Sequence, residues 1–145
     1  MKVVLDTNVY VEAARSDEGR RRFRAAFLPL LPVTFLAAVV AYELRVNAED
    51  RPTAKLVDEF VRPMEQSGRV VTPAFVDWTE ASEIVSSISG KDRGWRSKLP
   101  ALLNDILIAL SARRIGATLI TSNARDFQLI RRHREFSLRL IARAS

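Results

Sequence analysis

The chain of 145 residues is short enough for one domain, and its hydrophobic fraction of 48% excludes a disordered composition. It has no cysteine and a single histidine, which excludes a disulfide framework, a thiolate metal site and a multi-histidine zinc site. A bound metal would therefore need oxygen ligands, which suit Mg²⁺ or Mn²⁺. The net charge of +6 favours nucleic acid as a partner, although good solubility alone would also account for it.

Strand and helix patterns alternate along the chain. In order, we predict a strand at 2–5, a helix at 9–27, a short strand at 30–34, helices at 35–48 and 53–68, a strand at 69–73, a helix at 74–89, a loop at 90–100, a helix at 101–116, a strand at 117–121, a helix at 123–133 and a strand at 136–141. Pro63 should disturb its helix, and Gly68 should end it. This alternation predicts βαβ units and a mostly parallel sheet covered on both faces.

The apolar stretch at 27–42, "FLPLLPVTFLAAVVAY", is the one candidate for a membrane segment. It falls short of the roughly 20 residues that a spanning helix needs, and it contains Pro29 and Pro32. It also begins too late for a signal peptide, after a dense run of arginines. We therefore expect buried core here, no membrane attachment and a cytoplasmic location, which the lack of cysteine also fits.

Two carboxylates follow predicted strands, at the sheet edge where open α/β folds bind their ligands. Asp6 comes directly after the apolar run "KVVL", where it could equally cap the next helix. Asp126 lies in "TSNARDF", where Ser122 or Asn123 could cap a helix whose dipole favours an acid in the first turn. For each residue, both a structural and a chemical role remain open.

Two further carboxylates lie on apolar helix faces. Glu43 shares a face with valines, which is costly unless the charge is paired or bound to a cation. A salt bridge to Arg45 or another arginine is the structural alternative. Asp105 lies in "LLNDILIALSA", a helix that is apolar nearly all round, on the side of small alanines that leave space for a ligand. Neither position is typical of a surface acid.

These four carboxylates suggest a common site if the elements that bear them converge. Four negative charges in one pocket would repel one another, and divalent cations would offset that repulsion. Mg²⁺ is usually bound by few carboxylates together with water and substrate phosphate. Two ions about 3.5–4 Å apart would form a clamp for displacement at a phosphodiester. The basic surface would then hold the phosphate backbone.

The ordered motifs "VVLDTNVY", "AYEL", "NDILIALSARRIGATLIT" and "SNARDF" resemble a PIN domain, and most closely the VapC-type toxins of bacterial toxin–antitoxin pairs. The resemblance covers nearly the whole chain, so residues 1–145 are expected to form a single domain. It implies a three-layer α/β/α sandwich around a mostly parallel sheet of four or five strands. It also implies an Mg²⁺- or Mn²⁺-dependent endoribonuclease that uses one or two ions, forms a homodimer and is held inactive by a small cognate antitoxin.

The resemblance also assigns residues by motif. It implies that the catalytic metal ligands are Asp6, Glu43, Asp105 and Asp126. Thr121 and Asn123 match polar positions that support such a site, and Asn8 belongs to the "DTN" signature as a supporting or turn-shaping residue.

Two basic segments lie outside the family signature. The first, "GKDRGWRSKLP", resembles a patch that grips a nucleic acid strand, with these candidate RNA-binding residues: Arg93, Trp95, Arg96 and Lys98, beside Lys91. The alternative is a solvated loop with Trp95 packed on the body or at a dimer contact. The second, at 18–27, could bind RNA phosphates, present a solvated face with Phe23 and Phe27 turned inward, or receive apolar antitoxin residues.

Three alternatives come from other classes. An aspartyl-phosphate phosphatase needs a second acid two residues after the first, where this chain has Asn8. A response-regulator receiver needs an acidic pair early and a lysine late, and no lysine follows "TLITSN". A catalytically weak PIN-type domain that binds RNA or a partner remains the main competitor. Retention of all four acids favours an active nuclease.

Overall fold

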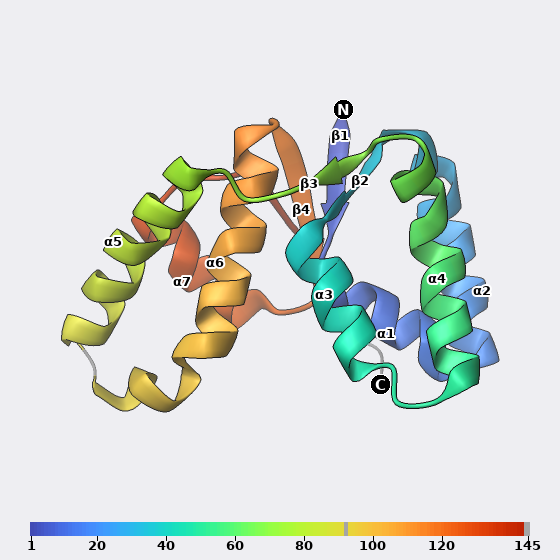
Figure 1. The fold of residues 1–145 in the computed structure, drawn as a ribbon, viewed down its shortest axis with the longest axis horizontal. Helices are drawn as coiled ribbons and strands as arrows, with labels where there is room; N and C mark the ends of the chain where they lie inside the picture. The colour runs from blue at the N-terminus through green and yellow to red at the C-terminus, as the bar shows by residue number, and fades with distance from the viewer. Residues whose placement is uncertain (92, 144–145) are drawn as a thin grey trace.

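The computed structural model describes residues 1–91 and 93–143, and they form an α/β fold around one parallel sheet (Figure 1). The described strands are β1 (Lys2–Leu5), β2 (Thr34–Ala37), β3 (Val70–Val71), β4 (Ala117–Thr121) and β5 (Leu138–Leu140), in the order β3-β2-β1-β4-β5. Every neighbouring pair is parallel, so the strands end at the same edge of the sheet. The predicted fold class, including a sheet of four or five strands, is confirmed.

Helices cover both sides of this sheet. They are α1 (Thr7–Arg15), α2 (Asp17–Phe27), α3 (Ala38–Asn47), α4 (Arg51–Gln66), α5 (Phe75–Lys91), α6 (Leu99–Arg114) and α7 (Ala124–His133), with 3₁₀ segments η1 (Leu28–Val33) and η2 (Arg93–Lys98). Figure 1 shows α5, α6 and α7 on one side of the strands and α2 and α4 on the other. In the part of the chain that the structure describes, no helix is both long and apolar enough to cross a membrane.

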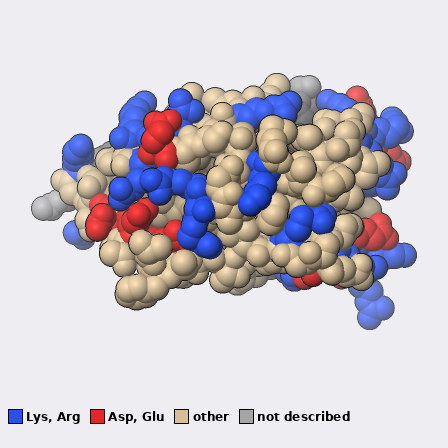
Figure 2. Space-filling view, turned by 90° about the horizontal axis from the view of Figure 1, so that it is seen from above, with Lys and Arg blue, Asp and Glu red and all other residues tan. Residues whose placement is uncertain are grey.

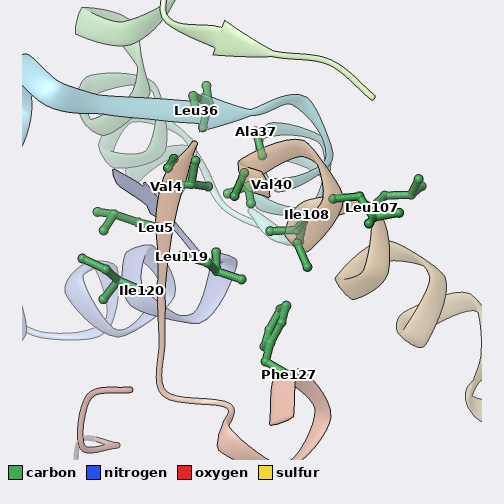
Figure 3. Packing of buried hydrophobic residues seen from close by; sticks show 14 of the residues in the cluster. Val4, Leu5, Leu36, Ala37, Val40, Leu107, Ile108, Leu119, Ile120 and Phe127 are labelled. Carbon is green, nitrogen blue, oxygen red and sulfur yellow. The ribbon is translucent and has the colours of Figure 1, made fainter. Parts of the chain in front are cut away.

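The core lies between β1, β2 and β4 and the helices that cover them. Figure 3 shows Val4 of β1 and Leu119 of β4 on the side of the strands where Phe127 of α7 lies, and Leu5 and Ile120 on the opposite side. The last three residues of β1 are almost fully buried, as expected for a strand covered on both faces. Helix α6 is buried from residue 106 to residue 112, which explains why its sequence is apolar nearly all round.

Two predicted boundaries in the first third of the chain are wrong. The helix expected at 9–27 is two helices, because Ser16 is extended and its side chain caps α2 by accepting a hydrogen bond from Gly19 N (2.9 Å). The strand expected at 30–34 is the 3₁₀ segment η1, which contains two prolines. The strand begins only at Thr34, since a strand that pairs on both edges requires the amide hydrogens that proline lacks. The following helix therefore starts at Ala38.

Later corrections concern α4, α5 and the segment at 90–100. Pro63 lies inside α4 without ending it, and Gly68, with φ +70°, follows the helix as predicted. The expected loop at 90–100 is helical in its described residues, comprising the end of α5, η2 and the start of α6. Phe75 and Trp78 share the apolar spacing of α5 but are 85% and 49% exposed, because α5 reaches the core only from Ala81 onward.

Candidate functional site

Asp6 ends the central strand and is 4% exposed. Its backbone N–H donates to the carbonyl of Ile120 (2.9 Å), which fixes the turn beside β4. Its two carboxylate oxygens accept hydrogen bonds from Thr7 N (2.8 Å) and Thr121 Oγ1 (2.7 Å), and it is also the N-cap of α1. Burial and, to a smaller extent, the charges of Glu43 and Asp126 raise the pKa of Asp6 to about 6, although these two bonds act in the opposite direction.

The three residues predicted to support the site are Asn8, Thr121 and Asn123, and hydrogen bonds join the other two to Thr121. Its hydroxyl accepts hydrogen bonds from Asn123 N (2.9 Å) and Asn8 Nδ2 (3.4 Å) while it donates to Asp6. Asn123 caps α7, because its Oδ1 accepts from Asp126 N (3.3 Å). The Asn123 amide also donates to Asp126 Oδ2 (3.1 Å). The acid in the first turn of α7 is therefore both capped and oriented.

Glu43 is half-buried on α3, and two side chains from other helices hold it. Its Oε1 accepts from Thr7 Oγ1 (2.7 Å) and its Oε2 accepts from Asn104 Nδ2 (3.3 Å). The expected alternative of a salt bridge to Arg45 is wrong, because that guanidinium reaches Glu65 (2.9 Å) and Asp58 (3.6 Å) instead. Neither Thr7 nor Asn104 was predicted to hold Glu43. The one available signal was an amide in the otherwise apolar α6.

Asp105 has the most strongly perturbed carboxyl group of the four. Burial in α6, together with the nearby charges of Asp6, Asp126 and Glu43, raises its pKa to about 8. Each of the other three acids thus contributes to the potential at Asp105, which places all four in one electrostatic cluster, while their role as metal ligands stays a prediction. Among the described residues, none of the four forms an ion pair with a lysine or arginine.

The donor chemistry of this cluster fits a hard divalent cation. All four side chains offer oxygen ligands, and their mutual repulsion is relieved by positive charge. Within residues 1–91 and 93–143, no three acidic or histidine side chains surround one point closely enough to hold an ion by themselves. Mg²⁺ commonly binds only one or two carboxylates and completes its coordination shell with water and phosphate. The cluster therefore fits an Mg²⁺ site of this kind.

The basic segment before α6 was predicted to be an open loop, but its described residues are helical and include η2. Trp95 is partly buried against the core, as the structural alternative proposed. Lys98 Nζ lies 5.5 Å from the centre of the indole ring. Arg96 and Lys98 are exposed on η2, and the side chain of Arg93 lies outside the described part of the structure. RNA binding by this segment stays a prediction.

The chain is similar to known proteins along nearly its full length. The family model described as the PIN domain matches residues 3–133. No curated protein sequence matches.

Solved structures agree in fold. A chain of VapBC2 from Rickettsia felis, bound to a DNA fragment from its promoter, has 19% identity and a TM-score of 0.66, with 97% of this chain and 99% of that one covered. DNA-bound VapBC from Salmonella typhimurium has 20% identity and a TM-score of 0.64, with 96% of this chain and 97% of that one covered. FitAcB from Neisseria gonorrhoeae has 20% identity and a TM-score of 0.60, with 94% of this chain and 95% of that one covered. The matched range includes all four clustered acids, and the chain belongs to the PIN domain family.

Proposed function

We propose that this protein is an Mg²⁺- or Mn²⁺-dependent endoribonuclease and the toxin of a toxin–antitoxin pair. The observation that supports this most strongly is the cluster of Asp6, Glu43, Asp105 and Asp126 at the carboxyl edge of the sheet, with no described basic side chain bonded to it. Membership of the PIN domain family supports nuclease activity in general. The net charge of +6 supports a polyanionic substrate.

The residues of the cluster have separable tasks in this proposal. A bound divalent ion would lower the pKa of a coordinated water and stabilise charge on the phosphate oxygens. Asp6 and Asp105 would hold it, and their raised pKa values mean that protons leave as the cation arrives. Thr121 fixes one oxygen of Asp6, and Asn123 orients Asp126. These bonds limit side-chain motion before substrate binds.

The structure also has a candidate docking pocket for an antitoxin, which none of the four acids lines. A cavity of about 180 Å³ lies between α2, η1 and α4. Its apolar lining includes Tyr10, Phe23, Phe27, Phe60 and Met64. We propose that apolar antitoxin side chains enter it, as in helix-in-groove recognition. We also propose a homodimer, in which a second copy covers exposed Tyr42 and Phe75.

The decisive test is to induce the protein briefly in a host that lacks the antitoxin and to map new RNA ends. We expect growth arrest and new ends at a defined position. The purified protein should produce the same cut with Mg²⁺ or Mn²⁺ and none with a chelator. No new ends and no growth arrest would favour the alternative of a catalytically weak RNA- or partner-binding domain.

Asn104→Leu should weaken cation binding, because Glu43 loses the donor that holds its Oε2. Removing such an outer partner typically lowers metal affinity by about 10–100-fold. Titration of the purified variant with Mn²⁺ by calorimetry measures this. Asn47→Leu, at an exposed position on α3, is the matched control and should leave the affinity unchanged. Equal affinity in Asn104→Leu and wild type would remove this residue from the site.

A further inference from the structure

A large groove lies near the carboxylate cluster. It has a volume of about 800 Å³ and runs between α1 and α2 on one wall and β5 with the following residues on the other. Asn8, which donates to Thr121 of the site, is one of its lining residues. The second wall is anchored next to the site as well, because Ile141 N donates to the carbonyl of Thr121 (2.9 Å). None of the four acids lines the groove, but each wall carries a residue bonded to Thr121, which in turn donates to Asp6.

The groove is strongly basic on both walls. Arg15 and Arg22 come from the helical wall, and Arg139 and Arg143 from the wall at the end of the chain. Of the described lining residues, only Glu12 is acidic.

These arginines are also largely free of partners. Arg15, Arg139 and Arg143 form no ion pair with any described residue, and Arg22 reaches only the exposed Glu18, at 3.8 Å. By contrast, Arg114 is bound to the buried Asp77 (3.0 Å). Exposed arginines left without carboxylates retain their full capacity for phosphate.

The shape of the groove indicates what kind of polyanion it accepts. Positive charges on two facing walls suit a strand that lies between them, whereas a duplex would meet only the rim. The partly exposed Phe27 and Ile141 add apolar surface for the faces of unpaired bases. The helical wall is built closely, because a side chain at Gly19 would meet the Glu12 carbonyl at 2.5 Å.

We propose that this groove binds the backbone of a single-stranded RNA segment and leads it to the carboxylate cluster. The inference rests on the proposed nuclease function, and it adds the form of the substrate and the path that it takes. Net charge alone would not locate this path, because lysines and arginines are also spread over the face at the amino ends of the strands (Figure 2). The concavity, the unpaired arginines and the contact with Asn8 distinguish the groove.

The first test compares two triple variants that remove the same charge. The groove variant is Arg15→Ala, Arg139→Ala and Arg143→Ala. The control is Arg51→Ala, Arg62→Ala and Arg132→Ala, at exposed positions outside the groove. Binding of a short single-stranded RNA and of a hairpin with the same composition is measured by fluorescence anisotropy in chelator, at several salt concentrations.

We expect the groove variant to bind the single strand about tenfold more weakly or worse, with the slope of log K against log salt reduced by about 2, since each lost contact removes about 0.7. The control should change little, and the hairpin should bind more weakly than the single strand to wild type. Equal weakening in both triple variants, or equal wild-type affinity for single strand and hairpin, would overturn the proposal. So would a groove variant that keeps its RNA affinity but loses binding to an acidic peptide.

The second test is independent of charge. Because the chain has no cysteine, Ala26→Cys in the groove and Ser86→Cys on α5 can each carry one photocrosslinker. Single-stranded RNA should crosslink from the first position and not from the second, and the reverse result contradicts the proposal. Both tests run without a metal, so they measure RNA binding separately from cleavage. If the protein cleaves RNA but the groove does not bind it, only this inference is contradicted. If the groove binds RNA but the protein does not cleave it, only the proposed nuclease activity is contradicted.

Discussion

Asp6→Asn and Asp105→Asn are each expected to lower Mg²⁺-dependent RNA cleavage by about 1,000-fold or more, which corresponds to the loss of several kcal/mol of transition-state stabilisation by a bound cation. Both carboxylates are substantially buried and have raised pKa values, and the charge of Asp6 contributes to the rise at Asp105, so each accounts for a large part of the attraction for a cation. Asparagine preserves the size of the side chain and removes the charge. Single-turnover cleavage of the mapped RNA at saturating enzyme measures the chemical step.

The matched control for this result is Asp58→Asn. Asp58 lies on α4, is half exposed and pairs only with Arg45 (3.6 Å) among described residues, so the same chemical change there should leave cleavage within about twofold of wild type. Circular dichroism and thermal melting confirm that each variant is folded. Wild-type cleavage by folded Asp6→Asn and Asp105→Asn proteins would falsify the metal-nuclease proposal, whatever the control does.

The elements that position the site were largely predictable from sequence. The runs "KVVL" and "ATLIT" are continuous and apolar, and both strands have the predicted bounds. Gly116, with φ +69°, follows α6 as predicted. The four acids were found one by one, because each is a carboxylate at a strand end or on an apolar helix face.

The errors arise where local sequence does not distinguish the possible structures. The stretch "FLAAVVA" is apolar throughout, so periodicity does not show that β2 ends at Ala37 and α3 begins at Ala38. The contacts of Thr7 and Asn104 with Glu43 join residues 36 and 61 positions apart, and they exist only once three helices have packed. The basic groove likewise is lined by both Arg15 and Arg139, which come from opposite ends of the chain.

The metal-free protein should become less stable as pH rises from about 5 to about 8. The pKa of Asp105 is about 8 and that of Asp6 about 6 in the folded protein, both above the ordinary value of 3.8. Between those values the folded chain binds more protons than the unfolded chain. The contribution of these two carboxyl groups to stability is therefore fully present below about pH 4 and is lost as pH rises through the folded pKa values. Solvent screening of the partly exposed Asp105 limits the loss to the order of 2 kcal/mol, or roughly 4–8 °C in melting temperature.

Calorimetric melting in chelator, across this pH range, measures the effect, and Asp105→Asn should abolish most of it because the amide does not ionise. Asp58→Asn should keep the pH dependence of wild type. Mg²⁺ should raise the melting temperature of wild type more at about pH 8 than at about pH 5, since a cation competes with fewer protons there. The melting temperature could instead stay constant or rise with pH, or it could fall equally in Asp105→Asn. Either result would mean that repulsion among these carboxylates does not destabilise the metal-free protein, which would remove the reason to regard the cluster as a cation site.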